Sequence, residues 1–191
     1  ERAGIHFTSL PDGEFDAPLG MSTGAGSIFG ATGGVMEAAL RTAADWLTGG
    51  EMKKLNFEEV RGVAPIKEAT YNVGGLEVNV AVASGTANAK KLLESVKSGE
   101  KQYHFIEIMG CPGGCVTGGG QPIVDARTRY YVDPRAARAA ATYSEDESMA
   151  IRKSHKNPAV QKLYAEFLGE PNSHIAHELL HTTYVDRSKD T

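Results

Sequence analysis

Hydrophobic and polar residues alternate along residues 76–82, where apolar side chains occupy every second position. This period of two is typical of a β-strand. Residues 87–96 follow with apolar side chains at helical spacing, and residues 103–108 form another short apolar run. A strand, a helix and a strand in so few residues predict a βαβ unit, whose two strands are parallel and end at one edge of the sheet.

A longer amphipathic helix is predicted from Thr32 to Gly49. Apolar residues recur there at helical spacing over about four turns, and a glycine pair ends the pattern. Glu37, Arg41 and Asp45 fall between the apolar positions, so the pattern predicts them on the polar side of this helix.

Three further segments carry weaker patterns. Residues 55–61 and 69–73 are short strand-like runs separated by a turn at Pro65. Residues 1–23 contain several prolines and glycines, which predict an ordered loop with little regular structure.

The pattern changes in the last third of the chain, where helical segments replace strands. One helix is predicted from Asp133-Pro134 to Tyr143, and another begins at Ser144. A third lies between the Asn157-Pro158 cap and Gly169. Short helices of this kind bury little core alone, so we expect them to wrap the rest of the chain or a partner.

These patterns together predict an α/β fold class. A parallel β-sheet lobe flanked by helices is expected at residues 1–130, and a C-terminal all-helical appendage at residues 131–191.

Composition then narrows the functional classes. The formal net charge is −4, which argues against nucleic acid as a partner, because nucleic acids select basic surfaces. No apolar run reaches the roughly 18 residues of a membrane span. The chain has 2 cysteines, close together, and they do not form a secreted disulfide scaffold. We therefore expect a reducing, cytoplasmic compartment, with a periplasmic parent protein as the alternative.

The two cysteines, Cys111 and Cys115, follow the apolar run at 103–108 and lie in a loop rich in glycine and proline. The predicted βαβ unit brings Ser84 and this loop to the carboxyl edge of the sheet, where open α/β sheets bind ligands. Two thiolates at this spacing can form a disulfide or ligate zinc or an iron-sulfur cluster, and inert packing is a further alternative. Structural zinc and a cubane each normally take four ligands, so this chain supplies half of either set.

At this loop the sequence resembles a known family. Residues 109–115, followed by Gly-Gly-Gly-Gln-Pro at 118–122, resemble the third signature of iron-only (iron-iron) hydrogenases, which interconvert protons, electrons and dihydrogen. Residues 10–16 and 22–39 resemble the conserved core of the same catalytic domain. Residues 152–158 and 176–181 resemble the helical tail that is known in this family as the small-subunit domain. The resemblance therefore covers nearly the whole chain, in the family's order.

The resemblance implies a ligand set for this loop. The family's active site, the H-cluster, is a 4Fe-4S cubane bridged through one cysteine to a two-iron subcluster with carbon monoxide, cyanide and a dithiolate. By motif, Cys111 would be a cubane ligand, and Cys115 would ligate the cubane and bridge to the two-iron unit. Gly113 and Gly114, with the glycines at 118–120, would let the backbone approach the cluster.

Other residues of the implied site come from different segments. By resemblance, Met109 and Phe29 would line an apolar cage around the two-iron unit, whereas composition alone predicts Phe29 and Met36 in the core. Glu107, two residues before Met109, would order the cysteine loop or serve a structural role.

Two signatures of the family are absent from this sequence. They are T-S-C-C-P and M-P-C-x-x-K, which carry the other two cubane cysteines, the proton-relay cysteine and a cyanide-binding lysine. The chain therefore resembles only the C-terminal lobe and the tail, and beginning at Glu1 without an initiator methionine favours a fragment. We expect it to lack the cluster and activity when alone. Its implied partners are the upstream N-terminal lobe and ferredoxin or accessory iron-sulfur domains as electron donor, with protons and dihydrogen as substrates.

Two alternative functions remain. His177 to His181 satisfy H-E-x-x-H, the motif of a zinc hydrolase, and His174 lies one turn earlier. Only ten residues follow His181, so a third zinc ligand would have to come from earlier in the chain. The other alternative is a non-catalytic interaction module of a redox complex, for which both cysteines would be dispensable.

Overall fold

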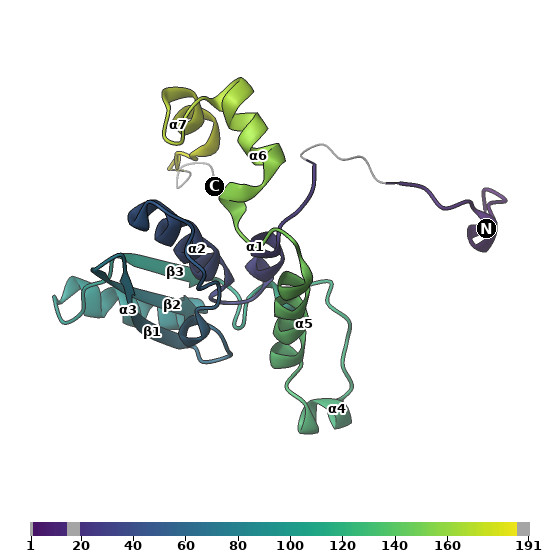
Figure 1. Cartoon of the computed structure of the whole chain (residues 1–191). Coiled ribbons are helices and arrows are strands. Elements are labelled where there is room, and N and C mark those ends of the chain that lie inside the picture. The colour runs from purple at the N-terminus through teal and green to yellow at the C-terminus, as the bar shows by residue number, and fades with distance from the viewer. Residues whose placement is uncertain (1, 15–19, 187–191) are drawn as a thin grey trace.

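The computed structural model describes residues 2–14 and 20–186 (Figure 1). The strands are β1 (Ile66–Val73), β2 (Leu76–Ser84) and β3 (Phe105–Met109). The α-helices are α1 (Gly24–Ser27), α2 (Gly34–Thr48), α3 (Thr86–Lys97), α4 (Ala126–Tyr131), α5 (Pro134–Ser148), α6 (Pro158–Leu163) and α7 (His174–Leu180). The predicted α/β class with a helical tail is thus observed.

The sheet has the order β1-β2-β3 and is mixed. β2 and β3 are parallel, with Ser84 opposite Met109, and α3 connects them, so the predicted βαβ unit is confirmed. β1 is antiparallel to β2, which corrects the expectation of a wholly parallel sheet. The cause is the two-residue turn at Gly74 and Gly75, whose φ values are +62° and +90°, since such turns join antiparallel strands.

The predicted strand at 55–61 is wrong. This segment is irregular apart from the 3-10 turn Glu58–Val60, and it is the run at 69–73 that belongs to a strand, β1. Phe57 and Val60 are both buried, three residues apart, and the Val60 N–H donates to the Phe57 carbonyl. A tight turn therefore directs both side chains into the core, which an extended strand would not do.

Helices cover both faces of the sheet. Met36, Leu40 and Ala44 of α2 pack with residues of β1 and β2 in the main core cluster, which contains Val80 and Val82. Ala81 and Ala83, on the opposite face of β2, pack against Leu92 of α3. The lobe is therefore a three-layer arrangement of α2, sheet and α3, visible at the lower left of Figure 1.

The helical tail differs from its prediction in one place. Ser144 and the following acidic residues lie inside α5, which runs unbroken from its Asp133 cap to Ser148, so the predicted break there is wrong. The Asn157 cap of α6 is confirmed, and Gly169 ends a π-helical turn, Tyr164–Leu168, that continues α6. α5 packs against α1, which joins the tail to the lobe (Figure 1).

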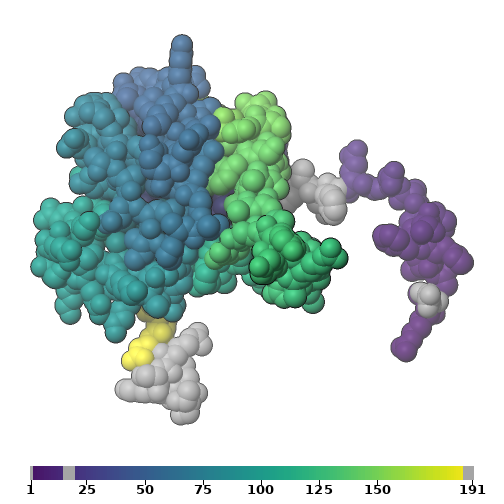
Figure 2. Space-filling view, turned by 90° about the horizontal axis from the view of Figure 1, so that it is seen from below, coloured from purple at the N-terminus to yellow at the C-terminus, as the bar shows by residue number. Residues whose placement is uncertain are grey.

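The described N-terminal segment, residues 2–14, is exposed and contains one 3-10 turn, Phe7–Ser9. It lies apart from the lobe and the tail (Figure 2). The predicted loop at 1–23 falls partly outside the described residues. None of the helices in the described ranges is both long and apolar enough to cross a membrane.

Candidate metal site

The loop after β3 holds both thiols on a short, closed segment. Cys111 and Cys115 are free and exposed. The Gly114 N–H donates to the Cys111 carbonyl at 3.0 Å, and the Thr117 hydroxyl donates to the carbonyls of Pro112 at 2.7 Å and Gly114 at 3.0 Å. These bonds fix the path of the backbone between the two thiols. The loop begins beside Ser84, so the predicted position at the carboxyl edge of the parallel strands is confirmed.

Gly113 and Gly114 bring this loop into direct contact with residues 30–32. Their φ values are +88° and +94°, a region that favours glycine. A Cβ atom at Gly114 would lie 2.6 Å from the Gly30 carbonyl oxygen and 2.8 Å from the Thr32 nitrogen. The Thr32 N–H donates to the Gly113 carbonyl at 3.2 Å. Gly114 therefore has a packing role here, and its role beside a cluster stays a prediction.

Phe29 lies outside the core. Its side chain is 44% exposed, whereas its neighbour Ile28 is fully buried, so the expectation from composition that Phe29 is a core residue is wrong. Met36 is fully buried in the core cluster, as expected. The turn Ile28–Gly30 contacts the loop through Gly30, and Met109 is half-buried at the end of β3. Phe29 and Met109 thus come from two segments that both border the cysteine loop.

Glu107 of β3 caps helix α2. Its Oε1 atom accepts from the Gly33 N–H and its Oε2 atom from the Met36 N–H, both at 2.7 Å. Gly33 has no side chain to cap the helix, so the carboxylate is supplied from a strand residue 74 positions further along the chain. A negative charge at a helix N-terminus is stabilised by the unpaired N–H groups there. These contacts agree with the structural role predicted for Glu107, and its role in ordering the cysteine loop stays a prediction.

Lys67 of β1 is a buried residue that the sequence reading overlooked. Its Nζ atom donates to the carbonyls of Thr32 at 2.8 Å and Gly62 at 2.9 Å. Burial lowers the pKa of Lys67 to about 8, against the attraction of Glu107, which raises it. The sequence pattern indicates this burial. Lys67 is in the same period-two series as Ala69, Tyr71 and Val73, so it lies on the inward face of β1.

The charged residues of α2 are buried, which corrects their predicted exposed position. Arg41 is fully buried and donates to Asp146 of α5 through both terminal nitrogens, at 2.7 and 2.8 Å, and to Glu37 at 2.8 Å. Arg152 also pairs with Asp146, at 2.6 Å, and Arg61 pairs with Glu37, at 2.7 Å. Burial alone would raise the pKa of Asp146, but hydrogen bonds from Arg41 and Arg152 hold it below its usual value.

A second ion pair joins the end of α2 to the tail. Asp45 accepts from Lys153 at 2.8 Å and from His155 at 3.0 Å, and the His155 ring also contacts the Thr42 hydroxyl at 3.0 Å. Burial favours the neutral form of Asp45, yet its pKa is lowered because Lys153 and a backbone N–H bind the carboxylate. The basic run at 152–156 therefore attaches the tail to the lobe.

The H-E-x-x-H segment lies on the exposed surface of the tail. His177 belongs to α7, a helix of 7 residues, and its ring contacts that of His181 just beyond the helix. His174 lies 3.9 Å from Glu178. Within residues 2–14 and 20–186, no group of three or more histidine, cysteine, aspartate or glutamate side chains is arranged to hold a metal ion. A zinc-hydrolase site is therefore incomplete in the described chain.

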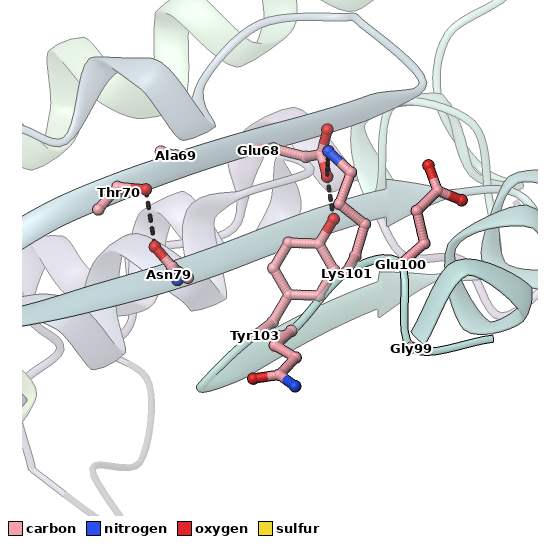
Figure 3. A pocket seen from close by; sticks show the side chains of 9 residues that line it. Glu68, Ala69, Thr70, Asn79, Gly99, Glu100, Lys101 and Tyr103 are labelled. Atoms are coloured by element: carbon pink, nitrogen blue, oxygen red, sulfur yellow. Dashed lines mark hydrogen bonds and ion pairs between the residues drawn. The ribbon is translucent and has the colours of Figure 1, made fainter. Parts of the chain in front are cut away.

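An open groove of about 530 Å³ lies at the other end of the parallel strands (Figure 3). Lys101 lies 3.4 Å from Glu68, to which the Tyr103 hydroxyl also donates, and Thr70 donates to Asn79 at 2.7 Å. These polar groups bind one another, and the residues that line the groove include neither cysteine. The groove is therefore separate from the candidate metal site.

The fold is thus an α/β protein with a pair of free thiols on a glycine-rich loop at the carboxyl edge of its parallel strands, the edge at which open α/β sheets bind ligands. The chain belongs to the iron-only hydrogenase family. Residues 1–119 match the model of the iron only hydrogenase large subunit, C-terminal domain, and residues 132–187 match that of the iron hydrogenase small subunit.

Individual relatives agree with this assignment. The chain is similar to the NADP-reducing hydrogenase subunit HndD of Solidesulfovibrio fructosivorans, at 49% identity over 99% of this chain and 32% of that protein. It is similar to iron hydrogenase 1 of Clostridium pasteurianum, at 47% identity over 95% of this chain and 32% of that protein. The chain thus spans about a third of the length of these curated relatives.

Solved structures agree as well. A variant of the [FeFe]-hydrogenase HydA1 from Chlamydomonas reinhardtii superposes with a TM-score of 0.69 at 41% identity, over 96% of this chain and 52% of that one. The chain is also similar to one [FeFe]-hydrogenase structure that concerns the assembly of the H-cluster and to another that concerns degradation of its 2Fe subcluster.

Proposed function

We propose that this chain provides two of the thiolate ligands of an H-cluster and that the complete protein catalyses 2H⁺ + 2e⁻ ⇌ H₂. The observation that carries the proposal is the pair of free, exposed thiols of Cys111 and Cys115 on a loop whose backbone is fixed by its own hydrogen bonds. Family membership agrees with this reading.

Cys111 and Cys115 fit the H-cluster in their chemistry, and they supply half of the ligands that its cubane needs. Thiolate sulfur is the ligand that iron-sulfur clusters take, and a cubane takes four. Cys111 would bind the cubane, and Cys115 would bind the cubane and the two-iron unit. When bound, the group supplies the iron site at which protons and electrons combine. Gly113 and Gly114 hold the loop close to residues 30–32, and both thiols are exposed.

Phe29 and Met109 would exclude water beside the thiols. Both border the loop, and neither belongs to the core clusters of the described residues. An apolar surround strengthens local electrostatic interactions and limits side reactions at a reactive centre. Their proposed part is therefore to keep the cluster pocket dry.

The remaining ligands would come from an upstream N-terminal lobe outside this chain. That the curated relatives are about three times as long agrees with this division. We further propose that residues 1–130 form the catalytic lobe and residues 131–191 the tail, and that ferredoxin or accessory iron-sulfur domains deliver electrons. A cytoplasmic protein is proposed, although one relative is a periplasmic [Fe] hydrogenase large subunit.

A hybrid enzyme tests the proposal. In this hybrid the chain replaces the matched segment of 182 residues in iron hydrogenase 1 of Clostridium pasteurianum and is expressed anaerobically in a host that assembles the cluster. We expect the hybrid to evolve dihydrogen from a chemical reductant, and Cys111→Ser or Cys115→Ser to abolish this activity. His177→Ala is the matched control and should leave the activity near that of the unsubstituted hybrid. Activity that survives both cysteine substitutions would refute the proposal.

A second candidate function is supported by more distant relatives. Cytosolic iron-sulfur assembly component 3 of Rattus norvegicus is 30% identical over 81% of this chain. A role in iron-sulfur assembly without dihydrogen chemistry would appear as a hybrid that binds iron through Cys111 and Cys115 but evolves no dihydrogen. The higher identity to hydrogenases favours the first proposal.

A further inference from the structure

Lys67 and Glu107 bind opposite sides of one buried peptide group. The Thr32 carbonyl accepts from Lys67 Nζ at 2.8 Å. The N–H of the same peptide, which belongs to Gly33, donates to Glu107 Oε1 at 2.7 Å. Both charged side chains are 6% exposed. The peptide is therefore held between an ammonium and a carboxylate in the interior of the lobe.

Stability alone does not account for this pair of charges. Removing a charge from water costs free energy that a buried partner only partly returns, and apolar replacements of buried ion pairs are often neutral or stabilising. Lys67 occupies the face of β1 that carries Tyr71 and Val73, where an apolar side chain would pack. Charged hydrogen bonds are directional and short, so the pair fixes the position of the peptide between them.

The neighbouring peptide, Ala31–Thr32, contacts the cysteine loop directly. Thr32 donates its N–H to the Gly113 carbonyl at 3.2 Å, and Gly114 packs against the same segment without room for a Cβ. The segment is confined from the other side as well. A Cβ on Gly33 would lie 1.9 Å from the Val60 carbonyl oxygen. A shift of the clamped peptide would therefore move the loop that carries both thiols.

We propose that Lys67 and Glu107 are positioning residues for the Cys111–Cys115 loop, holding it at the geometry for cluster binding through the Thr32–Gly33 peptide. This inference rests on the proposed function, since it assigns these residues to the same site. Neither residue touches the thiols, and their effect is transmitted by two backbone contacts.

The test uses the hybrid enzyme and two readouts other than activity. One is the rate at which iron is released to an anaerobic chelator, and the other is the reduction potential of the bound centre. Lys67→Met and Glu107→Gln should each accelerate iron release by about 10–100-fold, in proportion to the loss of metal affinity that is typical when groups that orient metal ligands are removed. Both should also shift the reduction potential, because the thiolates move relative to the iron.

Leu92→Ala is the matched control. Leu92 is 3% exposed and packs with Ala81 and Ala83 on the face of the sheet opposite to α2, so its loss destabilises the lobe without touching the clamp. We expect this control to keep the reduction potential and an iron-release rate within about twofold of the unsubstituted hybrid, since no group that orients a ligand is removed. Equal effects of Lys67→Met and Leu92→Ala on both readouts would overturn the positioning role.

The outcomes separate the two proposals. A Cys111→Ser hybrid that keeps its iron overturns the proposed function itself. A Cys111→Ser hybrid that loses iron, beside Lys67→Met and Glu107→Gln hybrids that keep it, overturns only the positioning role. If neither substituted hybrid folds, hydrogen exchange on the unsubstituted hybrid decides. The Gly33 amide should exchange as slowly as the central amides of β2, and exchange at the rate of an exposed loop contradicts the clamp.

Discussion

Arg41→Met should destabilise the chain strongly, because Arg41 joins the lobe to the tail at the centre of a buried charge network. Its guanidinium contacts Glu37 and Asp146, and all three side chains are fully buried. Methionine keeps an apolar stem of similar length but removes every donor. Among the described residues, Glu37 then keeps its ion pair with Arg61, and Asp146 keeps its ion pair with Arg152.

The expected loss is about 3–5 kcal/mol, the cost of removing one partner of a buried ion pair. The total stability of a domain is typically about 5–15 kcal/mol, so this loss takes a large part of it. Arg61 and Arg152 still neutralise part of the buried negative charge of Glu37 and Asp146, so we expect a loss of about 3 kcal/mol.

Urea unfolding of the chain, followed by circular dichroism, measures this change. Lys90→Met is the matched control, since the Lys90–Glu94 contact is 3.8 Å long, exposed and also of the i,i+4 type. Such pairs contribute about 0.5 kcal/mol or less. The double variant Arg41→Met/Asp146→Asn should lose less than the sum of the two single changes, because Asp146 no longer carries an unpaired charge. A loss below about 1 kcal/mol for Arg41→Met would refute the reasoning, because it would mean that the charges are not buried together.

Three further predictions concern the interior near the candidate site. The pKa of Lys67 is about 8 in the folded chain, below its ordinary value of 10.5. At pH values between these two pKa values, the unfolded chain therefore binds one more proton than the folded chain. The free energy of unfolding, relative to that of Lys67→Met, should rise by about 3 kcal/mol as the pH increases through this range, measured by urea unfolding. No rise would contradict the burial of the ammonium. Tyr143→Phe should raise the unfolding free energy by about 1 kcal/mol in the same assay, because the buried Tyr143 hydroxyl has no partner among the described residues, and a loss of stability would mean that it has one. Gly114→Ala should destabilise by about 1–3 kcal/mol, because a Cβ would meet the Gly30 carbonyl at a positive φ, and a calorimetric melting temperature equal to that of the unsubstituted chain would contradict the close contact.

The βαβ unit was predictable because its signals are local. Alternation along β2, helical spacing along α3 and the apolar run of β3 each reflect a side chain's own position in its element. The direction of β1 depended on Gly74 and Gly75, a two-residue glycine turn that favours a hairpin. That signal was in the sequence and was not used.

The buried charges of α2 were not predictable from helical spacing alone. Glu37, Arg41 and Asp45 follow one another at intervals of four, so they form one stripe, but a charged stripe normally faces water. Here it is covered by Asp146 and Lys153, which lie more than 100 residues further along the chain. Only the folded tail reveals that the stripe is an internal contact.

The site was predictable to the extent that motifs carry it. The spacing of Cys111 and Cys115 and the glycines between them predicted a tight loop at the carboxyl edge of the sheet, which the structure contains. The support beneath that loop was not predictable in detail. Which peptide Glu107 binds, and that Lys67 holds its other side, depend on three segments meeting in space.

The most direct test of the central claim is the content of iron and acid-labile sulfide per molecule of the hybrid enzyme, purified anaerobically. The account predicts equal iron and sulfide in the unsubstituted hybrid and in His177→Ala, and less of both in Cys111→Ser and Cys115→Ser, by the content of one cluster. Equal iron and sulfide in all four proteins would contradict the claim that this loop holds the cluster.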